Sequence, residues 1–156
     1  MVIIPQSLIH IENHLPNTGD EKLENMILSG LSSSQKKISS IFFYDGKGSH
    51  LFEQITTLPE YYLTRTEISL LHTIAEKLKD DIHHIDLVEF GSGDCKKISI
   101  LLDALSEKSR RSIRYIPFDV SLDAVKKSSE ILTDRYPELR IHGIVADFIT
   151  QLDVIP

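Results

Sequence analysis

The spacing of hydrophobic residues changes near residue 80, and the change separates two kinds of structure. Before it, apolar residues recur three and four positions apart, which is the period of a helix with one buried face. The strongest case is a helix over about residues 65–80, opened by a capping box at Thr64–Glu67, whose hydroxyl and carboxylate would satisfy free backbone donors. The residues expected on its inner face are Ile68, Leu71, Ile74, Ala75 and Leu78.

Weaker patterns precede this helix. Residues 1–19 are expected to be irregular, because prolines and a glycine interrupt them. Asp20 can cap a short helix that ends near Ser29, and a second short helix is expected before Pro59. The inward residues of the second helix would be Leu51, Phe52 and Ile55.

After residue 80, short apolar runs alternate with helical patterns. The expected strands cover residues 85–90, 113–118 and 141–145. The expected helices cover residues 96–106 and a segment that runs from Ser121, which can serve as the N-cap, to about residue 136. Strands that alternate with helices pair in parallel. The sequence therefore predicts an α/β protein with a doubly wound sheet and an N-terminal helical segment.

The chain ends about ten residues after the third expected strand. A doubly wound sheet usually continues beyond three strands, so we expect a fold that is truncated after the third one. The strand at 85–90, normally central, would then keep an unpaired edge. Such an edge is a template for another chain, and self-association through it or through nearby apolar faces is expected.

Composition and charge narrow the class of protein. A length of 156 residues, with 41% hydrophobic and 26% charged residues, suits one soluble domain. The net charge of −6 argues against a nucleic-acid partner. Cys95 is the only cysteine, which indicates a reducing compartment. No apolar run is long enough for a membrane and no signal-peptide pattern is present, so the expected location is the cytoplasm, without a membrane partner.

The segment Glu89–Asp94 places two glycines directly after an expected strand. Glycines there let the backbone approach a ligand closely, while the next helix offers free N–H groups. The dinucleotide-binding fingerprint needs a third glycine where this chain has Lys96. An acidic residue before two close glycines is better suited to S-adenosylmethionine. The alternative is a tight turn without a ligand.

Acidic residues follow the other two expected strands. Asp119 can accept both hydroxyls of a ribose, or else help to cap the next helix. Asp147 and Phe148 can bind an adenine amine and cover its ring, or else form a turn. All these positions lie at strand carboxyl ends, where a doubly wound sheet binds its ligand. Lys97 would be unfavourable in a first helical turn unless an anion such as the cofactor's carboxylate lay nearby, and a solvated lysine is its alternative.

Other reactive residue types form no recognisable site. The seven histidines show neither a zinc-protease spacing nor a cysteine-rich one, so no metal site is expected. No nucleophile elbow is present, and we assign no catalytic residue. Cys95 has no evident base partner and is expected to be a small packing residue.

Two linked motifs carry a more specific signal. Residues 43–56 read FYDGKGSHLFEQIT, and residues 58–67 read LPEYYLTRTE. Both resemble the histidine-specific S-adenosylmethionine-dependent methyltransferases, in which the second motif usually reads LPEYYPTRTE. The family's glycine loop, G-S-G-x-x-x-K, matches the segment Gly91–Lys97. The likeness covers about residues 35–150 and implies a Rossmann-like class I methyltransferase fold.

The resemblance implies a role for single residues. Cofactor contacts are implied at Tyr44, Gly91, Lys97, Asp119, Asp147 and Phe148. Tyr61 is implied to meet the substrate imidazole, whereas Tyr62 is expected to pack. Leu63 stands where the family usually has proline, which changes the stiffness of the loop more than its chemistry.

The resemblance also implies a reaction, the transfer of a methyl group from S-adenosylmethionine to the α-amine of histidine or a similar amino acid. Residues 1–80 would be an N-terminal helical segment with the motifs, and residues 81–156 the first half of the cofactor-binding domain. Because the family binds the substrate amine and carboxylate with later residues, we expect these 156 residues to be inactive alone. The alternatives are a non-catalytic cofactor-binding or interaction module and, less well matched, an NAD-type Rossmann domain.

Overall fold

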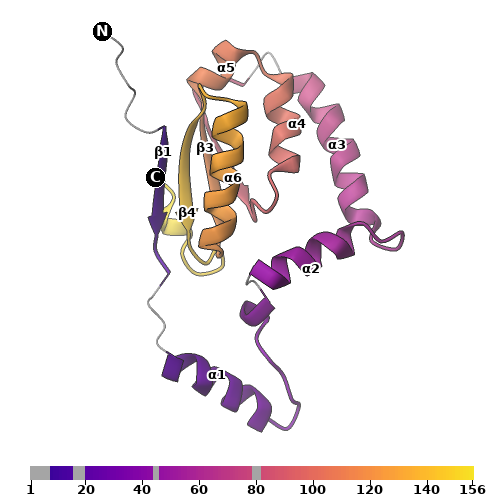
Figure 1. Cartoon of the computed structure of the whole chain (residues 1–156), viewed down its shortest axis with the longest axis vertical. Coiled ribbons are helices and arrows are strands. Elements are labelled where there is room, and N and C mark those ends of the chain that lie inside the picture. Colours follow the sequence, from indigo (N-terminus) through magenta and orange to yellow (C-terminus); the bar gives the residue numbers. More distant parts are fainter. Residues whose placement is uncertain (1–7, 16–19, 44–45, 79–81) are drawn as a thin grey trace.

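The computed structural model describes residues 8–15, 20–43, 46–78 and 82–156. Four parallel strands form one sheet in the order β1-β4-β3-β2 (Figure 1). Their bounds are Ile9–Asn13 for β1, Asp86–Phe90 for β2, Arg114–Asp119 for β3 and Arg140–Val145 for β4. The α/β class and the parallel pairing of the three predicted strands are therefore confirmed.

The α-helices that pack against this sheet cover one of its faces. The α-helices are α1 (Asp20–Ser32), α2 (Gly46–Thr56), α3 (Tyr62–Leu78), α4 (Lys96–Ala104), α5 (Glu107–Ser112) and α6 (Leu122–Arg135), and the short 3-10 helices are η1 (Ser40–Phe43) and η2 (Leu152–Val154). In Figure 1, α6 lies over β3 and β4, α4 lies beside it, and α3 packs outside α4. Helices α1 and α2 lie beyond the end of the sheet to which the strands point. No helix within the described ranges is long and apolar enough to cross a membrane.

The main hydrophobic core lies between the sheet and helices α4 and α6. Ile141 from the sheet meets Leu102 and Leu132 from the two helices, and all three are buried. Gly143 lets α6 approach β4 closely, because an added Cβ would lie 2.5 Å from Cγ1 of Val125. The opposite face carries a smaller cluster of Ile116, Phe118, Ile144 and Ala146, with Val154 and Ile155 packed against it.

The prediction of an irregular N-terminus is wrong for residues 9–13, which form β1. This strand pairs in parallel with β4, so that Ile9 lies opposite Ile141. Its partner is about 130 residues away along the chain, and local spacing cannot reveal such a pairing. The short helix predicted near residues 20–29 is present as α1, but Asp20 lies within it rather than before it as a cap, and the helix extends to Ser32, three residues beyond the expected end.

The capping box predicted at Thr64–Glu67 is also wrong, because α3 begins earlier, at Tyr62. A capping box needs a first residue outside the helix, whereas Thr64 lies within it. Of the expected inner-face residues, Ala75 is buried, Ile68 and Leu71 are half-buried, and Ile74 and Leu78 are exposed. The same correction applies to α2, where Leu51, Phe52 and Ile55 are exposed rather than inward.

Two helix ends show how a hydroxyl decides a boundary. Ser121 caps α6 as predicted, since its Oγ accepts a hydrogen bond from the Ala124 N–H at 3.2 Å. The helix expected over 96–106 ends at Ala104, and Ser106 caps a further helix, α5, which was not predicted. Its Oγ accepts the Ser109 N–H at 3.1 Å.

Candidate cofactor site

The glycine loop makes a sharp turn between β2 and α4. Gly91 and Gly93 have φ angles of +72° and +48°, a backbone conformation that residues with a side chain rarely adopt. The Gly91 N–H donates to the Phe118 carbonyl at 2.8 Å and so holds the loop against the end of β3. A Cβ on Gly91 would meet no heavy atom within 4 Å, so the space beside the backbone is open to a ligand.

Ser92, between the two glycines, has a buried hydroxyl. The residue is 3% exposed, and its Oγ has no hydrogen-bond partner among the residues that the structure describes. An unpaired buried hydroxyl costs about 1–3 kcal/mol. The open space at Gly91 and this hydroxyl both fit a loop that is completed by a polar ligand.

Cys95 closes the loop at the start of α4. Its backbone φ is 56°, and its side chain is 5% exposed within the main core. Burial raises the pKa of its thiol, so a thiolate is disfavoured. These contacts are those of a packing residue, as predicted.

Glu89 is a half-buried residue with its carboxyl two residues before the first glycine. Burial raises its pKa from 4.5 to about 7, while a hydrogen bond from the Tyr115 hydroxyl, 2.5 Å from Oε2, and the charge of Lys97 oppose that rise. A carboxyl that titrates near neutrality beside an open loop can meet a positive ligand group. Glu89 was not predicted as a site residue, although an acidic residue inside an apolar strand was the available signal.

Lys97 has an anionic partner from the protein itself. Its Nζ lies 3.3 Å from each carboxylate oxygen of Glu67, which belongs to the second family motif and lies on α3. This contact supplies the negative charge that a lysine in a first helical turn requires. A contact between Lys97 and the cofactor stays a prediction.

Asp119 ends β3 next to the glycine loop. Its Oδ1 accepts the Ser121 N–H at 2.9 Å, while Ser121 itself caps α6. Among the described residues, Oδ2 has no such partner and is left for a ligand. The Asp119 carbonyl accepts the Ala146 N–H at 3.0 Å, which joins the end of β3 to the end of β4.

Asp147 and Phe148 follow β4. Asp147 organises its own turn, because Oδ1 accepts the Ile149 N–H at 2.8 Å and Oδ2 accepts the Thr150 hydroxyl at 3.0 Å. A carboxylate has about four lone-pair sites, so a ligand amine can still bind there. Phe148 is 43% exposed and lies 6.1 Å from the Phe90 ring, measured between ring centroids, so a flat ligand can reach it.

Of the three tyrosines in the two motifs, the structure describes Tyr61 and Tyr62. Tyr44 lies outside the described residues. Tyr61 is half-buried in the turn between α2 and α3, with its ring edge-on to Phe52 at 6.0 Å. Tyr62 is 62% exposed, so the prediction that it packs is wrong.

Arg65 holds the turn that contains Tyr61, a role that the sequence analysis missed. Its guanidinium donates to the Leu58 carbonyl at 2.8 Å and to the Pro59 carbonyl at 2.5 Å. A third, longer bond of 3.4 Å reaches the Tyr61 carbonyl. Arg65 of the TRTE motif thus stabilises the LPEYY motif through hydrogen bonds from its side chain to backbone carbonyls.

The structure therefore brings Gly91, Asp119 and Asp147 to one edge of the sheet. A parallel α/β sheet with a glycine loop after one strand and acidic residues after the next two defines a Rossmann-like domain of the methyltransferase class. A family model described as "Histidine-specific methyltransferase, SAM-dependent" matches residues 23–156. The chain belongs to this family of S-adenosylmethionine-dependent methyltransferases.

Individual relatives agree with this assignment. The histidine N-alpha-methyltransferases of Mycolicibacterium smegmatis and Mycobacterium tuberculosis are each 36% identical to the chain, over 149 and 150 residues. Each alignment covers 95% of this chain and 46% of the relative. The N-methyltransferase fsqC of Aspergillus fumigatus is 31% identical over 145 residues, 90% of this chain and 39% of that protein. The chain thus spans about half the length of the curated relatives it matches.

Proposed function

We propose that this chain binds S-adenosylmethionine at the carboxyl edge of β2, β3 and β4, as the cofactor-binding part of an N-methyltransferase. The observation that carries the proposal is the convergence of three loops, which two backbone hydrogen bonds join. One runs from the Gly91 N–H to the Phe118 carbonyl, and the other from the Ala146 N–H to the Asp119 carbonyl. Such an edge is where doubly wound sheets bind nucleotides.

Each group at this edge matches one part of the proposed cofactor. S-adenosylmethionine supplies an electrophilic methyl group on a sulfonium. Asp119 would accept the ribose hydroxyls, Asp147 the adenine amine, and Phe148 would cover the adenine ring. Gly91 would admit the methionine portion, whose carboxylate would face Lys97 and whose ammonium would face Glu89. Tyr44 is a further proposed cofactor contact.

The proposed methyl acceptor is the α-amine of histidine or a similar amino acid, as the names of the two mycobacterial relatives suggest. Tyr61 would orient the substrate ring. The amine must be deprotonated before it attacks, and among the described residues we assign no general base. We therefore propose that residues 1–156 alone do not turn over and that groups outside them complete the substrate site.

Isothermal titration calorimetry tests cofactor binding. The chain is expected to bind S-adenosylmethionine and not NAD. Asp119→Asn should weaken S-adenosylmethionine binding about tenfold or more, because it removes a charged acceptor of two hydrogen bonds. Asp134→Asn, at an exposed aspartate on α6, is the matched control. Equal affinities of both variants, or tighter binding of NAD, would exclude the proposed site.

A methylation assay with histidine tests the proposed inactivity of residues 1–156, and it tests the non-catalytic cofactor-binding alternative as well, because neither predicts turnover. No turnover is expected from residues 1–156 by themselves. Measurable methylation by this chain would contradict both our proposal of inactivity and the non-catalytic alternative.

We further propose that the chain self-associates in the cytoplasm. Within the described ranges, β2 pairs only with β3, and Ile85 and Phe90 beside its free edge are 42% and 51% exposed. An uncovered strand edge favours pairing with another chain. A clean monomer by light scattering at high concentration would refute self-association. The single cysteine supports a reducing compartment, which cell fractionation checks.

A further inference from the structure

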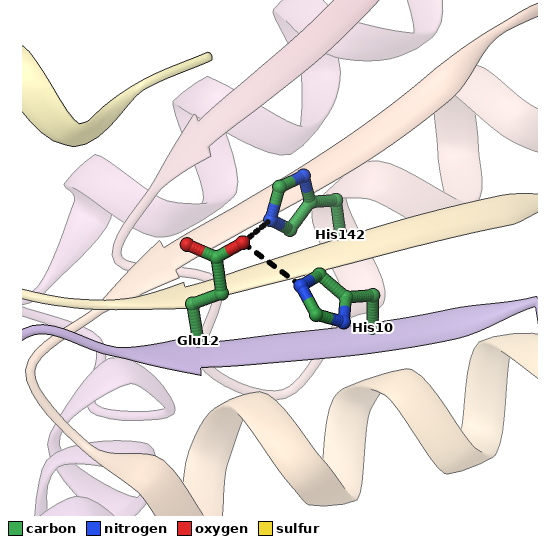
Figure 2. A group of neighbouring side chains, drawn as sticks. All are labelled: His10, Glu12 and His142. Atoms are coloured by element: carbon green, nitrogen blue, oxygen red, sulfur yellow. Dashed lines mark hydrogen bonds and ion pairs between the residues drawn. The ribbon is translucent and has the colours of Figure 1, made fainter.

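A cluster of histidines and a glutamate lies on β1 and β4, on the face opposite helix α6. His10 is the register partner of His142, and Glu12 follows two residues later on β1. Because side chains alternate along a strand, all three share one face. Gly143 points to the opposite face, toward Val125 of α6. Figure 2 shows the three side chains converging above the two strands.

The distances within this cluster are close to those of a metal site. Nε2 of His10 lies 2.8 Å from Oε1 of Glu12, and Nε2 of His142 lies 3.1 Å from the same oxygen. The three potential ligand atoms all lie within 4.8 Å of one another. Tetrahedral zinc, with bonds of about 2.0–2.1 Å, keeps its ligand atoms about 3.3 Å apart. The two nitrogen–oxygen distances would need to lengthen by only a few tenths of an ångström to reach this spacing.

The residues around the cluster orient the Glu12 carboxylate and leave the cluster accessible from solvent. His14, the next residue on this face, contacts the second carboxylate oxygen, with its Nε2 2.9 Å from Oε2 of Glu12. Hydrogen bonds of this kind orient the ligands of metal sites. The side chain of His142 is 14% exposed, that of Glu12 39% and that of His10 66%, so the cluster opens to solvent on one side.

We propose that His10, Glu12 and His142 bind one divalent transition-metal ion of the zinc class, with His14 hydrogen-bonded to the ligating glutamate. Two imidazoles and one carboxylate favour zinc and its neighbours over magnesium and calcium, which prefer oxygen ligands. Three protein ligands leave at least one position to water. The ion would join the N-terminal strand to β4, as a cross-link between residues about 130 positions apart.

Charges on the same face limit the affinity. Arg140 lies two residues before His142 on β4, and Arg114 is its register partner on β3. Asp86 offsets Arg114 through an ion pair. Zinc is therefore expected to bind more weakly than in a buried site with four protein ligands.

The test uses the whole 156-residue chain, freed of metal and titrated with zinc chloride against a chromogenic chelator. One zinc per chain is expected, without magnesium binding. His10→Gln and His142→Gln should each lower zinc affinity on the order of a hundredfold. His72→Gln, at an exposed histidine on α3, is the matched control and should change nothing. The absence of zinc binding, or equal affinities of all three variants, would overturn the proposal.

Nitrogen chemical shifts of the histidines in the parent chain give a test that does not depend on whether a variant folds. A free Nε2–H donates to Glu12, whereas zinc at Nε2 requires that the ring proton lie on Nδ1. Addition of zinc should move the Nε2 signals of His10 and His142 together, at one equivalent. If the signals of His83 and His84 move instead, zinc binds elsewhere and the assignment is wrong.

Discussion

Glu89 carries a carboxyl group whose ionised form destabilises the folded chain. It lies half-buried near the end of β2, where its carboxyl contacts the hydroxyl of the fully buried Tyr115. Burial is the main cause of its raised pKa, about 7 against an ordinary value of 4.5, and the Tyr115 hydroxyl only partly compensates. Above neutral pH, therefore, folding places a negative charge where solvation is poor.

The pH dependence follows from these two pKa values. The unfolded chain releases this proton near pH 4.5, whereas the folded chain keeps it to about pH 7. Between these values the folded state binds more protons, so the free energy of unfolding falls as the pH rises. A difference of about 2.5 units, at about 1.4 kcal/mol per unit, amounts to about 3 kcal/mol at most. This contribution is present in full below pH 4.5 and is lost above pH 7.

Glu89→Gln removes the charge and keeps an acceptor for the Tyr115 hydroxyl. Urea denaturation at pH 5 and pH 8 measures its effect. Relative to the parent, the variant should gain up to about 3 kcal/mol of stability between the two pH values. Glu130→Gln, at an exposed glutamate on α6, is the control and should show no such gain. A difference between Glu89→Gln and the parent that does not change with pH would refute the reasoning.

The same variant separates stability from binding. If Glu89 faces the ammonium of the cofactor, as we propose, the ionised carboxylate is what the ligand requires. Glu89→Gln should then be more stable than the parent at pH 8 and bind S-adenosylmethionine more weakly. A gain in both properties would exclude that role.

Three other substitutions probe the scaffold. Gly143→Ala should cost about 1–3 kcal/mol in urea denaturation, because its Cβ would overlap Val125, whereas Gly46→Ala meets nothing within 4 Å and should be near neutral. Arg65→Gln removes the guanidinium that holds residues 58–61, so amide hydrogen exchange should become faster there while the sheet stays protected. Gln151→Leu breaks the link from the β4 turn to β1 and should weaken S-adenosylmethionine binding several-fold by calorimetry; unchanged affinity would show that the turn is held without it.

The strands and the helices α4 and α6 that follow residue 80 were predictable because local sequence marks each of them, whereas α5 was missed. Apolar runs ended in turn residues, and Ser121 stood where a helix needs a cap. The candidate site followed from the same logic, since Gly91, Asp119 and Asp147 each lie at the end of a strand or within two residues of it. The topology then places parallel strand ends together, without any information about their side chains.

The N-terminal half was less predictable for physical reasons. The apolar spacing of α2 and α3 indicates a face that favours burial, but not what covers it, and Phe52 and Ile74 remain exposed in these 156 residues. The start of α3 at Tyr62 could not be predicted in the same way, because Tyr61, which precedes it, is not one of the residue types that cap helices. The role of Arg65 depended on which carbonyls its side chain could reach, and that is known only once the turn has formed.

β1 connects the two proposed sites, and it is the element that sequence spacing missed. Its exposed face carries His10 and Glu12, while the His14 carbonyl just beyond it accepts a hydrogen bond from Nε2 of Gln151 at 2.8 Å. Oε1 of Gln151 in turn accepts the Asp147 N–H at 2.9 Å, so the turn that presents the proposed adenine contacts is fastened to β1. An ion that joined β1 to β4 would therefore also restrain Asp147. Because linked equilibria are reciprocal, zinc and S-adenosylmethionine should strengthen each other's binding by the same factor, and independent affinities would show that the two sites are uncoupled.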